Sequence, residues 1–183
     1  HMKMIPTELN GCCILEPVVH GDERGFFVES WNRNTFSEMG LDLNFVQDNH
    51  SRSTRGVLRG IHYQIKNPQG KLVRVTQGSV FDVAVDIRSD SPTFGRWTGV
   101  ELSAQNNRML WVPPGFGHAF LVLSEHADFQ YKCTEFYSPE NDRGIRWDDP
   151  DVGIKWPEES SGKPTLSEKD LSLPSLKNAE LDT

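Results

Sequence analysis

Val57-Leu58-Arg59-Gly60-Ile61-His62-Tyr63-Gln64 is a short run typical of a β-strand, and Gln69-Gly70-Lys71-Leu72-Val73-Arg74-Val75 follows it as a second one. The residues between them contain a proline and a glycine, which favour a turn or loop. Side chains alternate along a strand, so His62 and Lys71 each point to one defined face. If those two faces coincide, an imidazole and an ammonium group lie in one cavity.

A base beside a cation indicates a particular chemistry. An enzyme that removes a proton from carbon next to a carbonyl needs a base, and a positive group near the oxygen that becomes negative. A lone histidine on a strand is more often a packing or surface residue, so further residues must support the reading. Strict alternation puts Arg59 on the face opposite His62, so a place for it in the same site requires a bulge near Gly60 or a role at the edge of the strand.

The chain has 183 residues, which is enough for one domain with a substantial core and too few for two. We read His1 and Met2, which precede a second methionine at Met4, as a remnant of expression, and the remainder, 3–183, as a single domain. Many short strands are expected, at 12–19, 26–31, 44–51, 79–87, 96–102, 108–112, 118–123 and 129–137. A short helix at 35–39, with Thr35 as its N-cap, and a helical turn at 167–170 complete the prediction.

Charge and cysteine content narrow the function classes. With 26 acidic and 19 basic residues the net charge is −7, which argues against a nucleic-acid-binding surface. No apolar run is long enough to span a membrane. The cysteines are three in number and lack metal-site spacing, so we expect a reduced, cytoplasmic protein that binds no nucleic acid and no membrane.

Pro113-Pro114-Gly115-Phe116-Gly117-His118 resembles the second motif of the cupin superfamily. The resemblance implies an all-β, double-sheet jelly roll with a few short helices. The first cupin motif carries two histidines and a glutamate. Here those places hold His62, Gln64 and Lys71, which make a poor site for a divalent ion. We therefore expect no metal, with Lys71 supplying the positive charge.

Two tyrosines and one aspartate complete the candidate chemistry. Tyr131 and Tyr137 are expected on one face of the strand at 129–137, where packing at the cavity rim is the simplest role. A phenol facing a histidine across a pocket could instead deliver a proton to the opposite face of a carbanion. Asp170 could hold the tautomer of His62, although sequence spacing does not show that contact.

Six blocks are similar to the dTDP-4-dehydrorhamnose 3,5-epimerase family, and the similarity runs from Ile14 to Pro174. They are GDERGFF (21–27), FVQDNHS (45–51), VLRGIHYQ (57–64), QGKLVR (69–74), FDVAVDIR (81–88) and LSEKD (166–170). The resemblance implies a dTDP-4-keto-6-deoxyhexose substrate, two inverted carbons beside the ketone, and no cofactor. It also implies a homodimer that exchanges N-terminal strands.

The resemblance also implies roles for individual residues. His62 would be the base with Asp170 as its partner, Lys71 would stabilise the enolate, and Tyr131 would return the proton. The remaining site residues that it implies are His118 and Asp82 beside these groups, Arg59 and Lys169 at the diphosphate and sugar, Gln47, Asn49 and Tyr137 at the nucleotide, and Arg24 and Glu29 from the neighbouring subunit.

Three alternatives stay open at this point. An epimerase acting at one carbon, or on another nucleotide sugar, would use the same base, cation and acid. A metal-dependent cupin is disfavoured by Gln64 and Lys71. A cupin that binds sugars without catalysis would have no need of an aligned base and acid.

Overall fold

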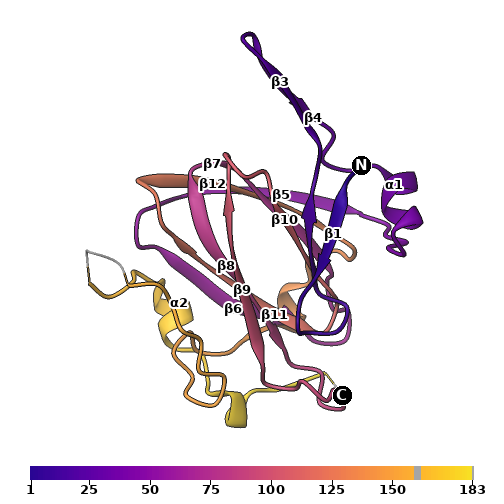
Figure 1. Ribbon diagram of the computed structural model, residues 1–183. Coiled ribbons are helices and arrows are strands. Elements are labelled where there is room, and N and C mark those ends of the chain that lie inside the picture. The colour runs from indigo at the N-terminus through magenta and orange to yellow at the C-terminus, as the bar shows by residue number, and fades with distance from the viewer. Residues whose placement is uncertain (159–161, 183) are drawn as a thin grey trace.

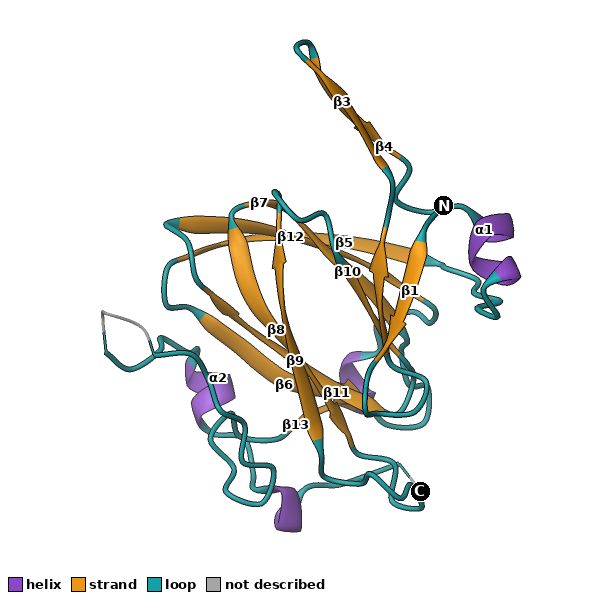
Figure 2. Ribbon diagram, in the orientation of Figure 1, coloured by secondary structure: helices purple, strands orange, loops and turns teal. Residues whose placement is uncertain are grey.

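Two antiparallel β-sheets face each other in the computed structural model, which describes residues 1–158 and 162–182 (Figures 1 and 2). One sheet has six strands and the other has five, and a separate two-stranded hairpin projects from one end. The predicted all-β, double-sheet jelly roll is confirmed. None of the helices in the described ranges has the length and apolar character needed to cross a bilayer.

The six-stranded sheet forms one wall of the sandwich. In spatial order its strands are β1 (Lys3–Pro6), β2 (Cys13–Glu16), β10 (Met109–Val112), β7 (Lys71–Gln77), β12 (His126–Cys133) and β5 (Gln47–Thr54). Its edges are therefore β1 and β5. Edge strands present unpaired backbone groups, so β5 can accept a further strand.

The five-stranded sheet forms the other wall. Its order is β13 (Asp142–Gly144), β6 (Leu58–Gln64), β11 (Phe116–Val122), β8 (Ser79–Asp86) and β9 (Trp97–Ser103). The C-terminal segment, with α2 (Glu168–Leu171) and the 3₁₀ turn η2 (Leu176–Asn178), packs against this sheet, and a second 3₁₀ turn, η1 (Pro139–Asn141), precedes β13.

Alternation along β8 explains why this strand is apolar on both faces. Val80 and Ala84 point into the core between the sheets. Val83 and Val85 point outward into a second core, which is covered by residues of the C-terminal segment such as Trp156. Because both faces of the strand are buried, its sequence reads as a nearly continuous apolar run.

The two strands that carry His62 and Lys71 lie in opposite sheets. β6 belongs to the five-stranded sheet and β7 to the six-stranded sheet. Their inner faces therefore look at each other across the sandwich, and the predicted meeting of the two side chains in one cavity is confirmed.

Strict alternation along β6 would put Arg59 and His62 on opposite faces, but a bulge in the strand brings both side chains to the same cavity. His118 pairs with His62 and Phe120 with Arg59, so two residues of β6 lie opposite one residue of β11 between these pairs. Gly60 lies at this irregularity with φ +121°, and a Cβ there would lie 2.6 Å from the Cβ of Ala119. Only glycine fits this backbone, and the bulge turns Arg59 to the side that His62 faces.

Four local predictions need correction. The strand expected at 12–19 is broken into β2 and β3 (Val19–Asp22), which forms the projecting hairpin with β4 (Gly25–Val28). Helix α1 (Arg33–Glu38) begins earlier than predicted because the side chain of Asn32, rather than that of Thr35, caps it. The strand expected at 44–51 begins only at the start of β5, and β12 ends at Cys133, so Tyr137 lies in the following loop.

Candidate active site

A cavity of about 460 Å³ opens between the two sheets. Most of its lining is polar, and it includes eight of the side chains predicted for the site. The lining residues are Gln47, Asn49, His50, Ser51, Arg59, His62, Lys71, His118, Phe120, Phe129, Tyr131 and Tyr137. Polar groups converging in a concave space are typical of a small-molecule site.

His62 reaches the cavity from β6 and is fixed from behind by Asp170. Its Nε2 lies 2.7 Å from Asp170 Oδ1, and the backbone N–H of Gly60 donates to Asp170 Oδ2 at 3.1 Å. Burial pushes the pKa of Asp170 upward, but the hydrogen bond and charge of His62, with the Gly60 N–H, outweigh it and leave that pKa lowered. An ionised carboxylate only accepts hydrogen bonds, so Nε2 carries the proton and Nδ1 is free to act as a base.

His118 lies directly opposite His62 in the neighbouring strand β11. Its Nε2 is 2.7 Å from Asp82 Oδ1, and both side chains are buried. The second oxygen of this carboxylate, Oδ2, is buried without a hydrogen-bond partner in the part of the chain that the structure describes. Burial raises the pKa of Asp82, while His118 and then Lys71 act in the opposite direction.

Lys71 and Tyr131 face the histidines from the six-stranded sheet. The ammonium nitrogen of Lys71 lies 5.4 Å from the centre of the Tyr131 ring. Burial raises the pKa of Tyr131, so its phenol keeps its proton at neutral pH. Burial lowers the pKa of Lys71, and nearby negative groups oppose that change.

The cavity therefore has the imidazole of His62 on one wall and the phenol of Tyr131 with the amine of Lys71 on the other. A planar carbanion between the walls could lose a proton to one side and gain one from the other, which inverts the carbon. A positive charge beside the carbonyl oxygen would stabilise the intermediate enolate.

The family model described as dTDP-4-dehydrorhamnose 3,5-epimerase matches residues 6–178 of this chain. An enzyme of that name from Salmonella typhimurium is 56% identical over 182 residues, which cover 98% of each chain. The chain belongs to the dTDP-4-dehydrorhamnose 3,5-epimerase family. The family predicted from the sequence is confirmed, and with it an isomerase-class enzyme.

Two solved structures of the epimerase family resemble the fold closely. A Legionella pneumophila 3,5-epimerase, in complex with dTDP-4-keto-L-rhamnose, has a TM-score of 0.95 and 50% identity, with 100% of this chain and 98% of that chain covered. A 3′-monoepimerase from Streptomyces bikiniensis, in complex with dTDP-quinovose, has a TM-score of 0.88 and 38% identity, with 95% and 88% covered.

Three residues predicted for the epimerase site lie elsewhere in this chain. Lys169 sits on α2, outside the cavity lining, and its Nζ donates to Asp142 Oδ2 at 2.6 Å. Arg24 is at the tip of the hairpin and pairs with Asp22 at 2.6 Å. Glu29 follows the hairpin beside Thr35 and Glu38, in a separate hollow.

Sequence reasoning missed the aromatic wall of the epimerase cavity. The rings of Phe120 and Phe129 stack with centroids 4.1 Å apart, and the ring of His118 stacks on Phe129 at 5.6 Å. Alternation could have found Phe120, which is two residues from His118 on one strand. Ser53 was also missed. Its hydroxyl oxygen accepts a 2.9 Å hydrogen bond from Arg59 Nε and thereby orients the guanidinium.

Gln64, which occupies a cupin ligand position, is committed to a structural role in this epimerase fold. Its amide nitrogen donates to the carbonyl oxygens of Asn67 and Phe136, and its Oε1 accepts from the Ser138 N–H at 2.9 Å. Across residues 1–158 and 162–182, no three His, Cys, Asp or Glu side chains are arranged to hold a metal ion.

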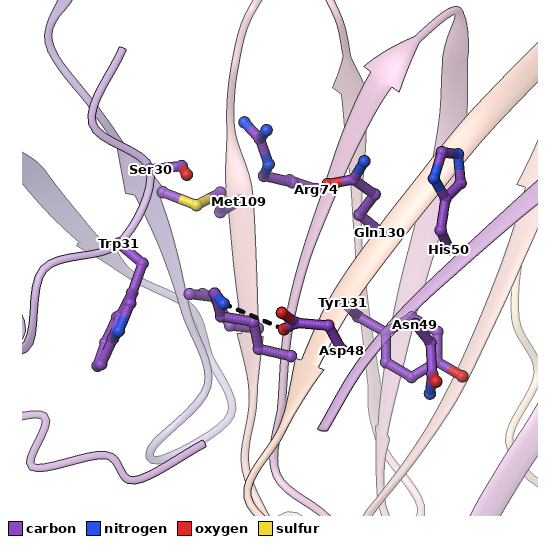
Figure 3. Close-up of a pocket in the computed structure, with 11 residues that line it drawn as sticks. Ser30, Trp31, Asp48, Asn49, His50, Arg74, Met109, Gln130 and Tyr131 are labelled. Carbon is purple, nitrogen blue, oxygen red and sulfur yellow. Dashed lines mark hydrogen bonds and ion pairs between the residues drawn. The ribbon is translucent and has the colours of Figure 1, made fainter. Parts of the chain in front are cut away.

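A second hollow, of about 340 Å³, lies on the other side of the six-stranded sheet (Figure 3). Ser30 and Trp31 lie on one side of it, and Arg74, Gln130 and His50 lie on the other. The hydrogen bond drawn in it joins Lys132 Nζ to Asp48 Oδ1 at 3.0 Å. Asn49, His50 and Tyr131 line this hollow as well as the cavity between the sheets.

Proposed function

We propose that this protein inverts C3 and C5 of dTDP-4-dehydro-6-deoxy-D-glucose to give dTDP-4-dehydro-L-rhamnose. The observation that carries the proposal is the position of His62 and Tyr131 on opposite walls of one cavity, with Lys71 between the sheets. Removal and return of protons from opposite sides is what inversion requires. Membership of the dTDP-4-dehydrorhamnose 3,5-epimerase family supports the same reaction.

The first step is removal of the proton on a carbon next to the ketone. The free Nδ1 of His62 takes the proton, and the electron pair of the broken C–H bond moves to the ketone oxygen as an enolate. Asp170 stabilises the imidazolium through its 2.7 Å bond to Nε2. The Lys71 ammonium stabilises the negative oxygen in a cavity where water screens charge poorly.

The second step is protonation from the other wall. The Tyr131 phenol gives its proton to the carbon, and the electron pair of the enolate forms the new C–H bond. A phenol whose pKa is raised stays protonated until the carbanion forms beside it. His62 then loses its proton and Tyr131 regains one, so the enzyme is restored and no cofactor is consumed.

Substrate binding uses the polar residues around the cavity mouth. Arg59 is held by Ser53 and is suited to the diphosphate. Lys169, on α2, is proposed to leave Asp142 and to contact the substrate from outside the cavity lining. The backbone N–H of Tyr137 donates to Gln47 Oε1 at 3.0 Å, which places an aromatic ring beside the amides proposed to contact the nucleotide. Those amides belong to Gln47 and Asn49, linked to each other at 3.2 Å.

The active form proposed is a homodimer in which each hairpin reaches the partner's cavity. β3 and β4 pair only with each other, and the side chains of Phe26 and Phe27 are 67% and 68% exposed. Exposed aromatic rings on a projecting hairpin favour a protein partner. Addition of the hairpin beside edge strand β5 would bring Arg24 and Glu29 to the cavity of a second copy. Three buried free cysteines suit the reducing cytoplasm.

The test is to incubate the protein with dTDP-4-dehydro-6-deoxy-D-glucose in deuterium oxide. Deuterium at both C3 and C5, with formation of the L-rhamno product, is expected. Absence of label at either carbon would contradict the proposal. Tyr131→Phe should still exchange at one centre while inverting poorly, and full turnover by that variant would remove Tyr131 from the mechanism.

A second candidate is inversion at one carbon only. The likeness to the 3′-monoepimerase, with a TM-score of 0.88, favours keeping it. Its identity of 38% is lower than the 56% shared with the Salmonella 3,5-epimerase, so the double inversion is preferred. The same experiment separates the two, because a monoepimerase labels one product carbon.

A further inference from the structure

The loop at 134–138 leads the chain from one sheet of the sandwich to the other, beside the cavity. It follows β12, which ends at Cys133 in the six-stranded sheet, and it leads through η1 to β13 in the five-stranded sheet. Tyr137 lies in this loop and lines the cavity, and it is 51% exposed. Because packing covers only about half of this residue, the backbone of the loop must set the position of its ring.

The side chain of Gln64, at the end of β6, holds this loop on both sides of Tyr137. Its Nε2 donates to the Phe136 carbonyl oxygen at 3.3 Å, and its Oε1 accepts from the Ser138 N–H at 2.9 Å. The same Nε2 donates to the Asn67 carbonyl oxygen at 2.9 Å. Gln64 is 5% exposed and Ser138 is 8% exposed, so water cannot easily take over these hydrogen bonds.

The six-stranded sheet holds the same loop from the other side. Gln47 Oε1, at the start of β5, accepts from the N–H of Tyr137 itself at 3.0 Å. The N–H of Gly70 donates to the Thr134 hydroxyl oxygen at 2.8 Å, and its carbonyl oxygen accepts from the Thr134 N–H at 3.0 Å. The backbone around Tyr137 is therefore tied to both sheets, with Gln64 making the bonds to its two neighbours.

Gln64 stands where the second histidine of the first cupin motif would stand, two residues after His62. A histidine that binds a metal ion there must offer a ring nitrogen with a free electron pair. Gln64 instead uses both ends of its amide on the loop, as donor and as acceptor. The position that serves an ion in other cupins is thus given over to holding a loop in this chain.

We propose that Gln64 is a positioning residue for nucleotide binding, which keeps the Tyr137 ring in its binding position before the nucleotide arrives. The inference rests on the proposed function, in which that ring lies against the nucleotide. A loop fixed in its bound conformation need not be ordered on binding, so affinity rises without any new contact. Gln64 itself touches neither the reacting carbons nor the nucleotide, and its effect passes through Tyr137.

The test is the affinity of Gln64→Met for dTDP, measured by titration calorimetry. Methionine has a similar length and makes neither hydrogen bond. Loss of the two bonds should raise the Kd for dTDP, and the KM for the sugar nucleotide, about tenfold. The kcat should stay within about twofold, because His62, Lys71 and Tyr131 keep their places. An unchanged Kd, or a fall in kcat with an unchanged KM, overturns the inference.

A double-mutant cycle with Tyr137→Ala shows whether the effect passes through the ring. Tyr137→Ala should itself weaken dTDP binding, and adding Gln64→Met should then change the Kd by less than about twofold. A variant that acts only by loosening the whole protein would weaken binding in both backgrounds. A full effect of Gln64→Met in the absence of the ring overturns the inference, and so does normal dTDP binding by Tyr137→Ala.

Gln69→Met is the matched control. Gln69 Nε2 donates to the Glu135 carbonyl oxygen at 3.0 Å, so the variant removes one hydrogen bond to the same loop, two residues before Tyr137. The bonds made by Gln64 remain, and the Kd for dTDP should change by less than about twofold. An effect equal to that of Gln64→Met would mean that any loosening of the loop suffices, which overturns the assignment to Gln64.

Hydrogen exchange gives a measurement that needs neither nucleotide nor turnover. The Ser138 N–H should exchange about tenfold faster in Gln64→Met than in the wild-type protein, since its acceptor is gone. If Gln64→Met does not fold, Gln64→Glu takes its place. That variant keeps an acceptor for Ser138 and loses the donor to Phe136, so its Kd should lie above that of the wild type.

The two proposals fail separately. A wild-type protein that places no deuterium in the sugar would refute the proposed epimerisation, while the dTDP affinities would still decide the role of Gln64. A wild-type Kd in Gln64→Glu, or an unchanged exchange rate at Ser138 in Gln64→Met, overturns the inference and leaves the epimerisation untouched.

Discussion

Two histidines on neighbouring strands of the five-stranded sheet each pair with an aspartate, His62 with Asp170 of α2 and His118 with Asp82 of β8, and the surroundings of the two pairs differ. In both, a histidine Nε2 lies 2.7 Å from a carboxylate oxygen. Asp170 has both oxygens bonded, and its His62 partner is 33% exposed at the cavity. Asp82 has one oxygen bonded, and its His118 partner is 8% exposed. Equal geometry therefore gives one lowered and one raised carboxylate pKa.

The two histidine–aspartate hydrogen bonds have the same length, so the surroundings of each pair, rather than that bond, decide whether the carboxylate pKa is lowered or raised. The His62 imidazole has a carboxylate partner and is partly exposed to the cavity, which suits the proposed role of a group that gains and loses a proton in every turnover. The His118 imidazole is enclosed, and it holds a carboxylate whose second oxygen has no hydrogen-bond partner among the described residues. One pair is open to the cavity, and the other is closed within the sheet.

Replacing each of the two histidines separately is expected to give the largest difference in activity between the two pairs. His62→Ala should slow exchange of substrate carbon-bound protons with deuterium oxide by about 10³-fold or more, since it removes the base. His118→Asn should slow it by about tenfold, because Lys71 and His62 remain. Exchange followed by NMR measures both. Equal losses in the two variants would show that the pairs share one role.

Gly60→Ala tests the bulge on which both pairs depend. The added Cβ would lie 2.6 Å from both the Ala119 Cβ and the His118 carbonyl oxygen, at φ +121°. We expect a loss of about 2–4 kcal/mol in the free energy of unfolding, from backbone strain plus the clash. Urea unfolding measures it.

Gly25→Ala provides the control for that variant. Gly25 also has a positive φ, +135°, but nothing lies within 4 Å of the position of its Cβ. This variant should lose only the strain contribution, about 1–2 kcal/mol. A loss as large as that of Gly60→Ala would mean that the close approach of β11 to the bulge is unimportant.

A further expected effect is on stability as a function of pH. Asp170 has a lowered pKa, so it stabilises the folded state above its unfolded pKa of about 3.9, and this contribution is lost as pH falls through the folded pKa. Asp170→Asn should therefore cost about 1–3 kcal/mol at pH 7 and progressively less below about pH 4. Urea titrations at a series of pH values check this. A gap that widens on acidification would contradict the assigned ionisation of Asp170.

Much of the fold follows from alternation in the sequence. β8 alternates between two cores, and its pattern alone predicted which side chains share each face. The mismatch between Arg59 and His62 predicted the bulge, because both residues were expected at one site. The ends of the strands were harder to predict from the sequence. Tyr137 lies beyond β12 because pattern does not mark where hydrogen bonding between strands stops.

The candidate site was predictable only in part. His62 and Lys71 are near in sequence, so strand faces were enough to bring them together. Asp170 is 108 residues from His62, and only the docking of α2 against β6 brings them into contact. The unpartnered oxygen of Asp82 depends on every side chain around it, and no local pattern encodes that.

The base and the cation stand on opposite sheets, so the interior thickness of the sandwich sets the gap between them. Residues of the central core such as Val73 and Ala84, which touch no substrate, thereby act as spacers for the chemistry. A larger or smaller side chain at such a core position would change the distance between the two walls of the cavity and thereby the rate of turnover. Activity should consequently vanish together with the cooperative separation of the sheets on heating, and not before it.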